Sequence, residues 1–554
     1  MAPPHARKRR TMKKGKKKQD DAEDDVYRCG RCGRVGRDRC ALHPTESTKR
    51  THGVSGGGVV ELALPSSDDA QWSVVERVLA PLHAVEGAPV GARELDAALT
   101  QFAEAKRDPS APDGPPCVFF ENIPGSSEDP GTFDWERFFA LGVPFMVRVA
   151  LDMPRLFEDA LPLPVFQMRS SWENGSGPGT LGTQSVTLSR PQCACLLAHS
   201  FFGSLRRPPA VEPNDFRFTA VDLFLGTAAS PNSAMTFLNY FSVLGVRAAA
   251  GAMPGGEVRF ERVGYRRGGA APWKWKASIR PLCKAKLVDG TINDCSADVH
   301  AEFANAYVGG GVLSGDAAME ETLFLVKPEL MVAMALNGRM VDREAIAVSG
   351  ALQYSLTSGF GQSFTFASDY DEGREGAPPR VVAIDAIRGG GPALTKRAML
   401  RDMNKARIAF EGAREVATGH WGCGAYGNNH NLMFLKQWLA ASDAGATCMY
   451  YHDFSRAQSH HIAPLIRKLK HLTVREAWCF ILDLTSDLVP CKMGKFYTRV
   501  CDIATGKLEV PGASSAAAAK QRKKKKKKKK KTEEVEEVAA ALPTLPPAPI
   551  DDLK

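Results

Sequence analysis

The sequence predicts an α/β protein in which buried strands lead into glycine-rich turns and helices. The segment 380–387, RVVAIDAI, is rich in β-branched residues, as is typical of a strand buried in the middle of a sheet. Two glycine-rich segments, 309–311 and 419–427, follow apolar, strand-like runs, and the second leads into a helical pattern from Asn429 to Ala441. A chain of 554 residues is long enough for two or three domains.

Composition restricts the class of protein. Hydrophobic residues make up 44% of the chain, so most of it can build cores. No run of 18 apolar residues occurs and the first residues contain no apolar signal-peptide core, so a soluble, intracellular protein without membrane contact is expected. Thirteen cysteines without paired spacing fit a reducing compartment.

The formal net charge of +10 is concentrated in two tails. Residues 1–18 hold nine Lys or Arg and residues 520–531 hold eleven, with no acid in either segment. Without these 20 basic residues the chain has 52 basic against 62 acidic residues, so its body is acidic. A nucleic-acid-binding protein is therefore disfavoured, because its basic patch is expected on the folded face.

The tails, 1–25 and 511–554, are predicted to be disordered because they offer too few apolar residues to form a core. Their basic clusters are candidate signals for a nuclear import receptor and loose tethers for polyanions. A nuclear location is expected, with some protein in the cytoplasm. The alternative is a solvated charged tail that no receptor binds.

Residues 26–52 contain a C-x2-C-x7-C-x2-H pattern of potential metal ligands: Cys29, Cys32, Cys40 and His43. Three thiolates and an imidazole suit tetrahedral zinc, and this segment has little else to fold around. The pattern therefore predicts a structural zinc knuckle, with His52 as an alternative fourth ligand. The other interpretation is a disordered tail with incidental cysteines.

The first glycine-rich segment is followed, seven residues later, by two adjacent carboxylates. Gly309, Gly310 and Gly311 come after a strand-like run that extends to Val308, and Glu320 and Glu321 open a helical pattern. Glycines allow a ligand to approach the backbone closely, and a pair of carboxylates can supply acid/base chemistry. Acidic residues are also common at ordinary helix starts, so the spacing alone leaves both interpretations open.

This stretch resembles the signature of the poly(ADP-ribose) glycohydrolases, which have three glycines, a spacer of about seven residues, Gln-Glu-Glu and a later Pro-Glu-Leu. The glycines, both glutamates and Pro328-Glu329-Leu330 match, whereas Met319 stands in place of Gln. The preceding residues are similar to the family's Asp-Phe-Ala-Asn strand, with Glu302 in place of Asp and Asn305 retained.

Three other segments extend the resemblance. Residues 184–207 resemble a family segment in which a Ser-rich entry leads into a buried helix, and Ser189 and Gln192 form its capping box. Residues 237–241 resemble the helix before the catalytic part. In the family the neighbourhood of residues 290–292 holds an adenine, so the resemblance implies that Ile292 is an apolar contact. Phe360 matches a family Tyr that covers the ligand, so it keeps a stacking surface but lacks the hydroxyl.

The second glycine-rich segment is similar to the family's Ala-Thr-Gly-Asn-Trp-Gly-Cys-Gly-Ala-Phe-Gly. His420 replaces Asn and Tyr426 replaces the Phe that packs on a ribose. Glycines at a strand-to-helix junction expose backbone amides, so a diphosphate site is expected; the residues concerned are His420, Gly422, Gly424, Ala425 and Tyr426. Cys423 is interpreted as a structural thiol and not a nucleophile. The histidines His430, His452 and 460–461 lack metal-ligand spacing and are expected to be exposed.

The resemblance implies a macrodomain-like mixed sheet flanked by helices at 226–510, with a mostly helical accessory domain at 56–225. It implies hydrolysis of the ribose–ribose O-glycosidic bonds of poly(ADP-ribose), a role in the DNA damage response, and modified proteins as partners. Glu321 is the expected general acid and base, and Glu320 is expected to hold ribose hydroxyls. Glu302 and Asn305 are expected to orient the ribose, and the amides of Gly309 to Gly311 are expected to hold the diphosphate together with those of the second glycine-rich segment. A monomer that needs no catalytic cofactor is expected; the alternative is a module that binds ADP-ribose without cleaving it.

Overall fold

The computed structural model divides the chain into two compact units, Met1–Gly58 and Val59–Lys554. In the first unit it describes the backbone of three short strands. In the second unit it describes residues 61–83, 90–106, 117–120, 133–158, 163–166, 181–208, 211, 218, 220, 231–265, 273–370, 377–453, 460–485 and 493–510.

The three strands of the first unit form a small antiparallel sheet in the order β2-β1-β3; their bounds are Tyr27–Cys29 for β1, Val35–Gly36 for β2 and Ser47–Lys49 for β3. Of the four predicted zinc ligands, only the backbone of Cys29 is described, at the end of β1. Cys32, Cys40 and His43 lie outside the described residues, as do both predicted tails. The zinc knuckle therefore stays a prediction.

An eight-stranded mixed sheet organises the second unit, in the order β4-β5-β8-β11-β7-β12-β13-β6. Its strands are β4 (Gly182–Ser189), β5 (Glu257–Gly264), β6 (Lys284–Val288), β7 (Val299–Glu302), β8 (Glu344–Ser349), β11 (Arg380–Ala383), β12 (Glu415–Thr418) and β13 (Cys448–His452). The five strands from β11 to β6 run parallel, and β4, β5 and β8 pair antiparallel beside them. The expected mixed sheet is confirmed.

Both faces of the sheet are buried, because alternate residues of its central strands enter two different cores. In β8, Ile346 and Val348 join the core beneath the N-terminal helices, whereas Ala345 and Ala347 join the core of the C-terminal helices. The same alternation in β11 explains its continuous run of β-branched and small residues.

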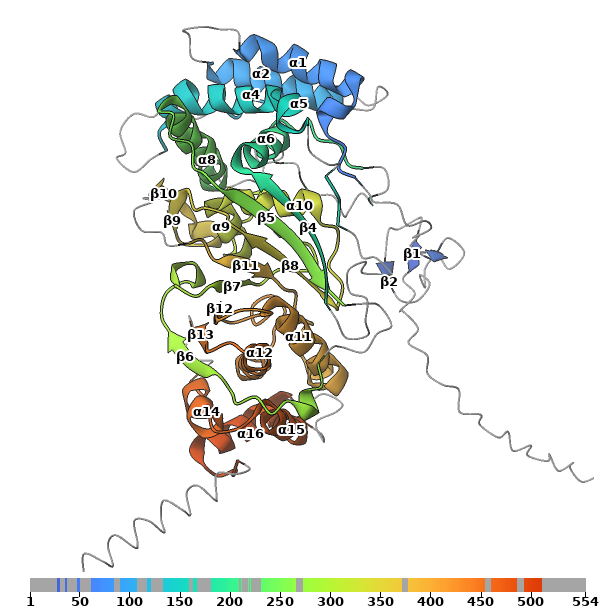
Figure 1. Cartoon of the computed structure of the whole chain (residues 1–554), viewed down its shortest axis with the longest axis vertical. Helices are drawn as coiled ribbons and strands as arrows, with labels where there is room; N and C mark the ends of the chain where they lie inside the picture. The colour runs from blue at the N-terminus through green and yellow to red at the C-terminus, as the bar shows by residue number, and fades with distance from the viewer. Residues whose placement is uncertain are drawn as a thin grey trace, which may run out of the picture. The chain divides into compact units, whose positions relative to one another are not determined.

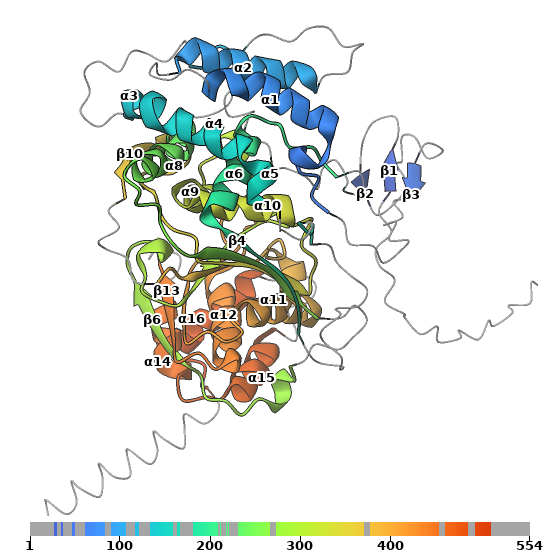
Figure 2. The same ribbon diagram turned by 45° about the horizontal axis from the view of Figure 1, so that its top comes forward.

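Helices cover both faces of the sheet (Figures 1 and 2). The N-terminal helices and the two that follow β7 lie on one face: α1 (Asp69–His83), α2 (Ala92–Ala105), α3 (Trp135–Arg137), α4 (Val143–Leu151), α5 (Met153–Leu156), α6 (Arg190–Phe201), α8 (Pro231–Ala249), α9 (Met319–Val326) and α10 (Val332–Leu336). The C-terminal helices lie on the other: α11 (Lys396–Ala409), α12 (His430–Ala444), α14 (Ile462–Leu469), α15 (Val474–Thr485) and α16 (Met493–Thr505). No helix of the described residues is long and apolar enough to cross a membrane.

Several helix starts follow from local sequence alone. Ser189 caps α6 with the predicted capping box to Gln192. Thr395 caps α11 by accepting from the amide of Ala398, and Asn429 caps α12 by accepting from the amide of Leu432. These caps fix where each helix begins after the strand before it.

Two sequence-based expectations differ from the structure. The strand expected to extend to Val308 is β7, which ends at Glu302, because the chain turns away from the sheet there. The segment 353–361, whose alternating aromatics suggest a loop, contains strand β9 (Ser355–Ser358), which pairs with β10 (Thr365–Asp369) in a two-stranded hairpin. The accessory region predicted to be mostly helical contains one strand of this sheet, β4, which pairs with β5 along all eight residues.

Candidate functional site

The candidate residues gather at one edge of the sheet, where its parallel strands end. Strand β7 lies between β11 and β12, and after β7 the chain builds β8 and β11 on one side before it returns to build β12 and β13 on the other. Ligands of open α/β sheets bind at such a switch point, outside the carboxyl ends of the strands. Glu302, at the end of β7, lies at this point.

Three carboxylates converge there. Glu302 is 3% exposed and Glu321, in the first turn of α9, is 7% exposed. Four of their oxygens are buried and accept no hydrogen bond within the described part of the chain: both of Glu302, Oε1 of Glu320 and Oε2 of Glu321. Buried polar atoms are normally paired, so these four oxygens mark a place where a polar ligand is expected.

Burial changes the acidity of this cluster. Burial raises the pKa of Glu302 well above that of an ordinary carboxyl, and the negative charges of Glu320 and Glu321 raise it further. The pKa of Glu320 is also raised well above its usual range, first by burial and then by the charge of Glu321. Glu302 and Glu320 therefore keep their protons at a higher pH than an exposed carboxyl would.

The first glycine turn wraps around these carboxylates. Gly309 and Gly310 have positive φ angles of 85° and 53°. A Cβ atom on Gly310 would lie 2.2 Å from Oε1 of Glu321 and 3.0 Å from Oε2 of Glu320, so only glycine leaves both carboxylates in place. The amide of Gly311 donates to Oε1 of Glu321 at 3.0 Å, and Oδ1 of Asn305 accepts from the amide of Tyr307 at 2.7 Å.

These contacts refine the expectation that the first turn holds a diphosphate. The amide of Gly311 is engaged by Glu321, and that of Gly310 donates to the carbonyl of Tyr307 at 3.4 Å. The turn thus orients the acid groups in this structure. Holding a phosphate with either amide would require one of these bonds to open.

The second glycine loop, between β12 and α12, presents free amides. Gly424 and Ala425 are exposed, and the amides of Gly424, Ala425 and Tyr426 donate no hydrogen bond to any described residue. Gly422, near the start of this loop, has a positive φ of 66°. A Cβ at this position would lie 2.5 Å from the Cβ of Ala386, so the loop requires glycine here. Three consecutive unpaired amides in this loop, which ends where α12 begins at His430, are donors that can bind an anion.

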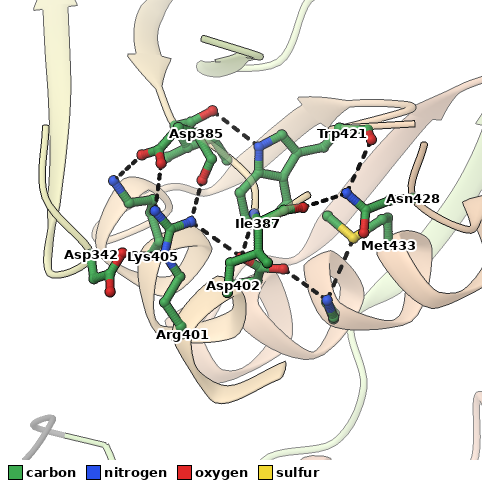
Figure 3. Close-up of polar contacts among 12 residues, drawn as sticks. Asp342, Asp385, Ile387, Arg401, Asp402, Lys405, Trp421, Asn428 and Met433 are labelled. Atoms are coloured by element: carbon green, nitrogen blue, oxygen red, sulfur yellow. Dashed lines mark hydrogen bonds and ion pairs between the residues drawn. The ribbon is translucent and has the colours of Figure 1, made fainter. Parts of the chain in front are cut away.

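A buried ionic network, drawn in Figure 3, supports this loop. Lys436 of α12 donates to Oδ2 of Asp402 at 2.8 Å, and Oδ1 of Asp402 accepts from the amide of Ile387 at 3.2 Å. The side-chain amide of Asn428 donates to the carbonyl of Ile387 at 2.7 Å. The segment after β11 and the second glycine loop are therefore fixed to each other and to the two helices beneath them.

Asp385 belongs to the same network, directly after β11. Its carboxylate accepts from Arg401 at 2.5 Å and from Lys405. Burial opposes its ionisation, but the two cations outweigh that effect and lower the pKa of Asp385 below its usual value. The sequence pattern gave no sign of this network, because its members pair across 15 to 34 residues.

His420 replaces the family's Asn and pairs with a carboxylate. Its Nε2 lies 3.1 Å from Oδ1 of Asp453, and its ring packs edge-on against that of His430 at 4.4 Å. Burial lowers the pKa of His420, and Asp453 offsets part of that shift. His452, expected to be exposed, is 3% exposed and bonded through Nδ1 to the carbonyl of Gly290.

Tyr426 belongs to the second glycine loop. Burial and the negative charges of Asp385 and Glu320 raise its pKa. The guanidinium of Arg388 lies 5.0 Å from the centre of the Tyr426 ring. Arg388 is exposed and forms no ion pair with any described residue, and sequence reasoning did not identify it.

The remaining candidates lie around the mouth of the site. Ile292 is half-buried in a short 3-10 turn, Ile292–Asp294, beside Asn293, whose side chain donates to Gln353 at 2.6 Å. Phe360 is 69% exposed and Met319 is 54% exposed. The amide of Gly361 donates to the carbonyl of Ala317 at 2.6 Å, which holds the Phe360 turn beside the start of α9.

Glu329, part of the matching Pro-Glu-Leu, has a structural role that the sequence did not indicate. It is fully buried, and its carboxylate accepts from Arg190 at 2.5 Å and from the hydroxyl of Tyr354 at 2.9 Å. Arg190 is the first residue of α6, so this pair ties the helical layer to the segment that follows α9. Across the described residues, no group of three or more His, Cys, Asp or Glu side chains is placed to hold a metal ion.

Two family models match the chain. Residues 272–461 match the model described as "Poly (ADP-ribose) glycohydrolase (PARG), Macro domain fold", and residues 134–262 match the helical domain of the same family. The two matches together cover more than half of the chain. They include the sheet edge with its three carboxylates and both glycine segments.

Curated relatives agree with these matches. The chain is 28% identical over 430 residues to "Probable poly(ADP-ribose) glycohydrolase 2" of Arabidopsis thaliana, covering 63% of this chain and 79% of that protein. It is 27% identical over 362 residues to "Poly(ADP-ribose) glycohydrolase 1" of Caenorhabditis elegans, covering 60% of this chain and 44% of that protein. The poly(ADP-ribose) glycohydrolase of Thermomonospora curvata, solved with the inhibitor ADP-HPD, is 15% identical, with a TM-score of 0.23 and coverage of 32% and 74%.

Proposed function

The chain belongs to the poly(ADP-ribose) glycohydrolase family and is a poly(ADP-ribose) glycohydrolase, and from this premise we propose how it cleaves its substrate. It hydrolyses the ribose–ribose O-glycosidic bonds of poly(ADP-ribose) and releases ADP-ribose. Glu321 acts as the general acid and then as the general base. The proposed reaction uses no metal and no cofactor.

One observation supports the role of Glu321 as the general acid. Its Oε1 is held by the amide of Gly311, while its Oε2 is buried and accepts no hydrogen bond within the described part of the chain. A carboxyl fixed through one oxygen presents the other in a defined direction, which general acid catalysis needs. We assign Oε2 of Glu321 as the atom that donates the proton to the glycosidic oxygen.

The reaction then proceeds in two proton transfers. Glu321 protonates the leaving ribose oxygen as the bond to the anomeric carbon breaks, and an oxocarbenium-like state develops. Water attacks the anomeric carbon, and the Glu321 carboxylate accepts the proton that the water loses. The acid is thereby restored. One product carries a hydroxyl on the former leaving oxygen, the other carries the hydroxyl of the water on its anomeric carbon, and both are released.

Glu302 and Glu320 hold the ribose in this scheme. Because burial and neighbouring negative charges raise the pKa of both groups, each can donate a hydrogen bond as a neutral acid as well as accept one. Ribose hydroxyls both donate and accept, so they suit the three buried oxygens of these two residues that lack partners. Asn305 lies in the segment between β7 and the first glycine turn.

The diphosphate would lie in the second glycine loop. The unpaired amides of Gly424, Ala425 and Tyr426 supply donors, and the guanidinium of Arg388 beside Tyr426 supplies positive charge. Tyr426 offers a ring face to a ribose, and Phe360 and Ile292 offer apolar surface around the site. The pair with Asp453 orients the ring of His420, which stands where the family has an amide side chain.

The test is release of free ADP-ribose from labelled polymer. The wild-type protein should release it, and Glu321→Gln should abolish release while ADP-ribose affinity stays within about tenfold, because the amide keeps the shape but cannot donate the proton. Near wild-type turnover by Glu321→Gln would remove this residue from the mechanism. Wild-type protein that binds ADP-ribose but releases none would instead be a binding module.

We also propose that the basic tails direct this enzyme to the nucleus, where it acts in the DNA damage response. The proposal rests on the clusters in residues 1–18 and 520–531, each dense enough for recognition by an import receptor. Deleting residues 1–18 and 512–554 together should move the protein to the cytoplasm. Turnover of short oligomers should remain, and continued nuclear location would contradict the proposal.

A further inference from the structure

A basic surface lies on the acidic body and is made of residues that belong to neither tail. Residues 273–288 contain five Lys or Arg and no acid, and residues 462–475 contain four Lys or Arg, one His and no acid. The first segment begins with alternating tryptophans and lysines. Trp275 is buried and bonded through its indole N–H to Asn404 at 2.8 Å, whereas Lys274 and Lys276 are exposed.

Backbone hydrogen bonds hold these two segments side by side. The amide of Leu282 donates to the carbonyl of Leu472 at 3.1 Å. In return, the amides of Val474 and Arg475 donate to the carbonyls of Arg280 and Ser278 at 2.9 and 3.0 Å. The cations of the two segments therefore share one surface, beside α14 and α15 at the foot of Figure 1.

Most cations of this surface have no partner in an ion pair among the described residues. Eight of its cations are exposed and form no ion pair within the described part of the chain: Lys274, Lys276, Arg280, Lys284, Arg467, Lys468, Lys470 and Arg475. Two carboxylates lie nearby, and the charge of one of them, Glu476, acts on the adjacent Arg475. Glu476 accepts from the amide and hydroxyl of Thr473, and Asp443 accepts from Arg407 at 3.0 Å.

Strand β6 joins this surface to the candidate site. It begins at Lys284 in the basic surface and runs parallel to β13 to Val288, a distance of about 13 Å for four residue steps. The chain then reaches Gly290, whose carbonyl accepts from His452, and the turn that contains Ile292. A long ligand could therefore reach both ends of this edge strand.

We propose that this basic surface is a secondary binding site for the substrate polymer, which holds chain units beyond the one being cleaved. The proposal rests on the proposed function. Poly(ADP-ribose) carries a diphosphate in every unit, and a body that is otherwise acidic repels such a chain except where cations are gathered. A nucleic acid carries phosphates too, but the connection along β6 to the cleavage site favours the substrate.

The experiment compares ADP-ribose release from short oligomers and from long polymer at several salt concentrations. The variant is the full chain with Lys276→Gln, Lys284→Gln and Arg475→Gln; all three side chains are exposed and bond to no described side chain. The matched control removes three exposed charges from other parts of the body, through Arg77→Gln, Arg148→Gln and Arg339→Gln. Affinity for DNA and RNA of equal length is measured in parallel.

The variant should raise KM for long polymer at least about tenfold at low salt, with kcat unchanged, and leave short oligomers unaffected. The slope of log KM against log salt should fall by about 2 for the three lost charges. An unchanged KM, or an equal rise in the control, would overturn the proposal. Loss of DNA or RNA affinity with an unchanged KM would assign the surface to nucleic acid instead.

Failure of the proposed function would look different. Wild-type protein would then release no ADP-ribose from either substrate. Binding of long polymer to Glu321→Gln protein, with and without the three patch substitutions, still tests the basic surface in that case. Equal affinity of these two proteins for long polymer would refute it.

Discussion

The close contact between Gly310 and the carboxylates allows catalysis to be disturbed without unfolding the protein. In Gly310→Ala the new Cβ would lie 2.2 Å from Oε1 of Glu321, where ordinary contact begins at 3.4 Å. The carboxylate must therefore move by about 1 Å, which is easy for the end of a flexible side chain. A misplacement of about 1 Å can cost about 100-fold in rate.

The cost in stability should be small and can be controlled. Alanine at a positive φ costs about 1–2 kcal/mol. Gly412 has φ 74° and open space around the position of a Cβ, so Gly412→Ala carries the backbone penalty without the steric contact. Both variants should lose similar stability in denaturant titrations, while only Gly310→Ala loses kcat, by about 100-fold.

The result that would refute this reasoning is a kcat for Gly310→Ala within about threefold of that for Gly412→Ala. It would mean that the position of Glu321 set by the glycine turn does not limit the reaction. A much larger stability loss in Gly310→Ala would show that the turn cannot move to accommodate the methyl group. Initial rates on short oligomers and urea titrations of both variants decide between these outcomes.

Four further results are expected. Phe360→Tyr restores a hydroxyl at the exposed mouth and should tighten ADP-ribose binding by about 0.5–1.5 kcal/mol in calorimetry; unchanged affinity would mean that this turn does not cover the ligand. The raised pKa of Glu302 means that its ionisation lowers stability as pH rises, so Glu302→Gln should raise Tm at pH 7–8 and lose this advantage towards pH 4; a difference independent of pH would contradict this. Asp402→Ala leaves the ammonium of Lys436 buried without its carboxylate and should cost about 3–5 kcal/mol in denaturant titrations, part of which Lys436→Met should recover when both changes are combined. Elemental analysis should find one zinc per chain, Cys32→Ser should lose it and hydrolysis should survive; metal-free wild-type protein would remove the knuckle.

Local features of the sequence predicted local features of the structure. The caps at Ser189, Thr395 and Asn429 depend on side chains three residues from the amides they bond, so the sequence contains the whole interaction. The glycine turns were recognisable for the same reason. The end of β7 could not be recognised from the sequence, because an apolar run continues to Val308 and nothing local marks the turn after Glu302.

Long-range pairs could not be predicted from one sequence. Arg190 and Glu329 are 139 residues apart, and each resembles an ordinary surface charge until the fold buries the two together. Likewise, His452 gave no sign that Gly290, 162 residues earlier in the chain, would accept its hydrogen bond. The resemblance identified the candidate residues but not Arg388, whose place beside Tyr426 depends on the segment after β11 packing against the second loop.

The placement of β7 between strands that come later in the chain has a consequence for folding. The two glycine segments are more than 100 residues apart in sequence, and they become neighbours only when β12 pairs with β7. Contacts of such high sequence separation form slowly, whereas helices form from local contacts. During refolding, helical content should therefore return before ADP-ribose binding does, and the delay would measure the time taken to close the centre of the sheet.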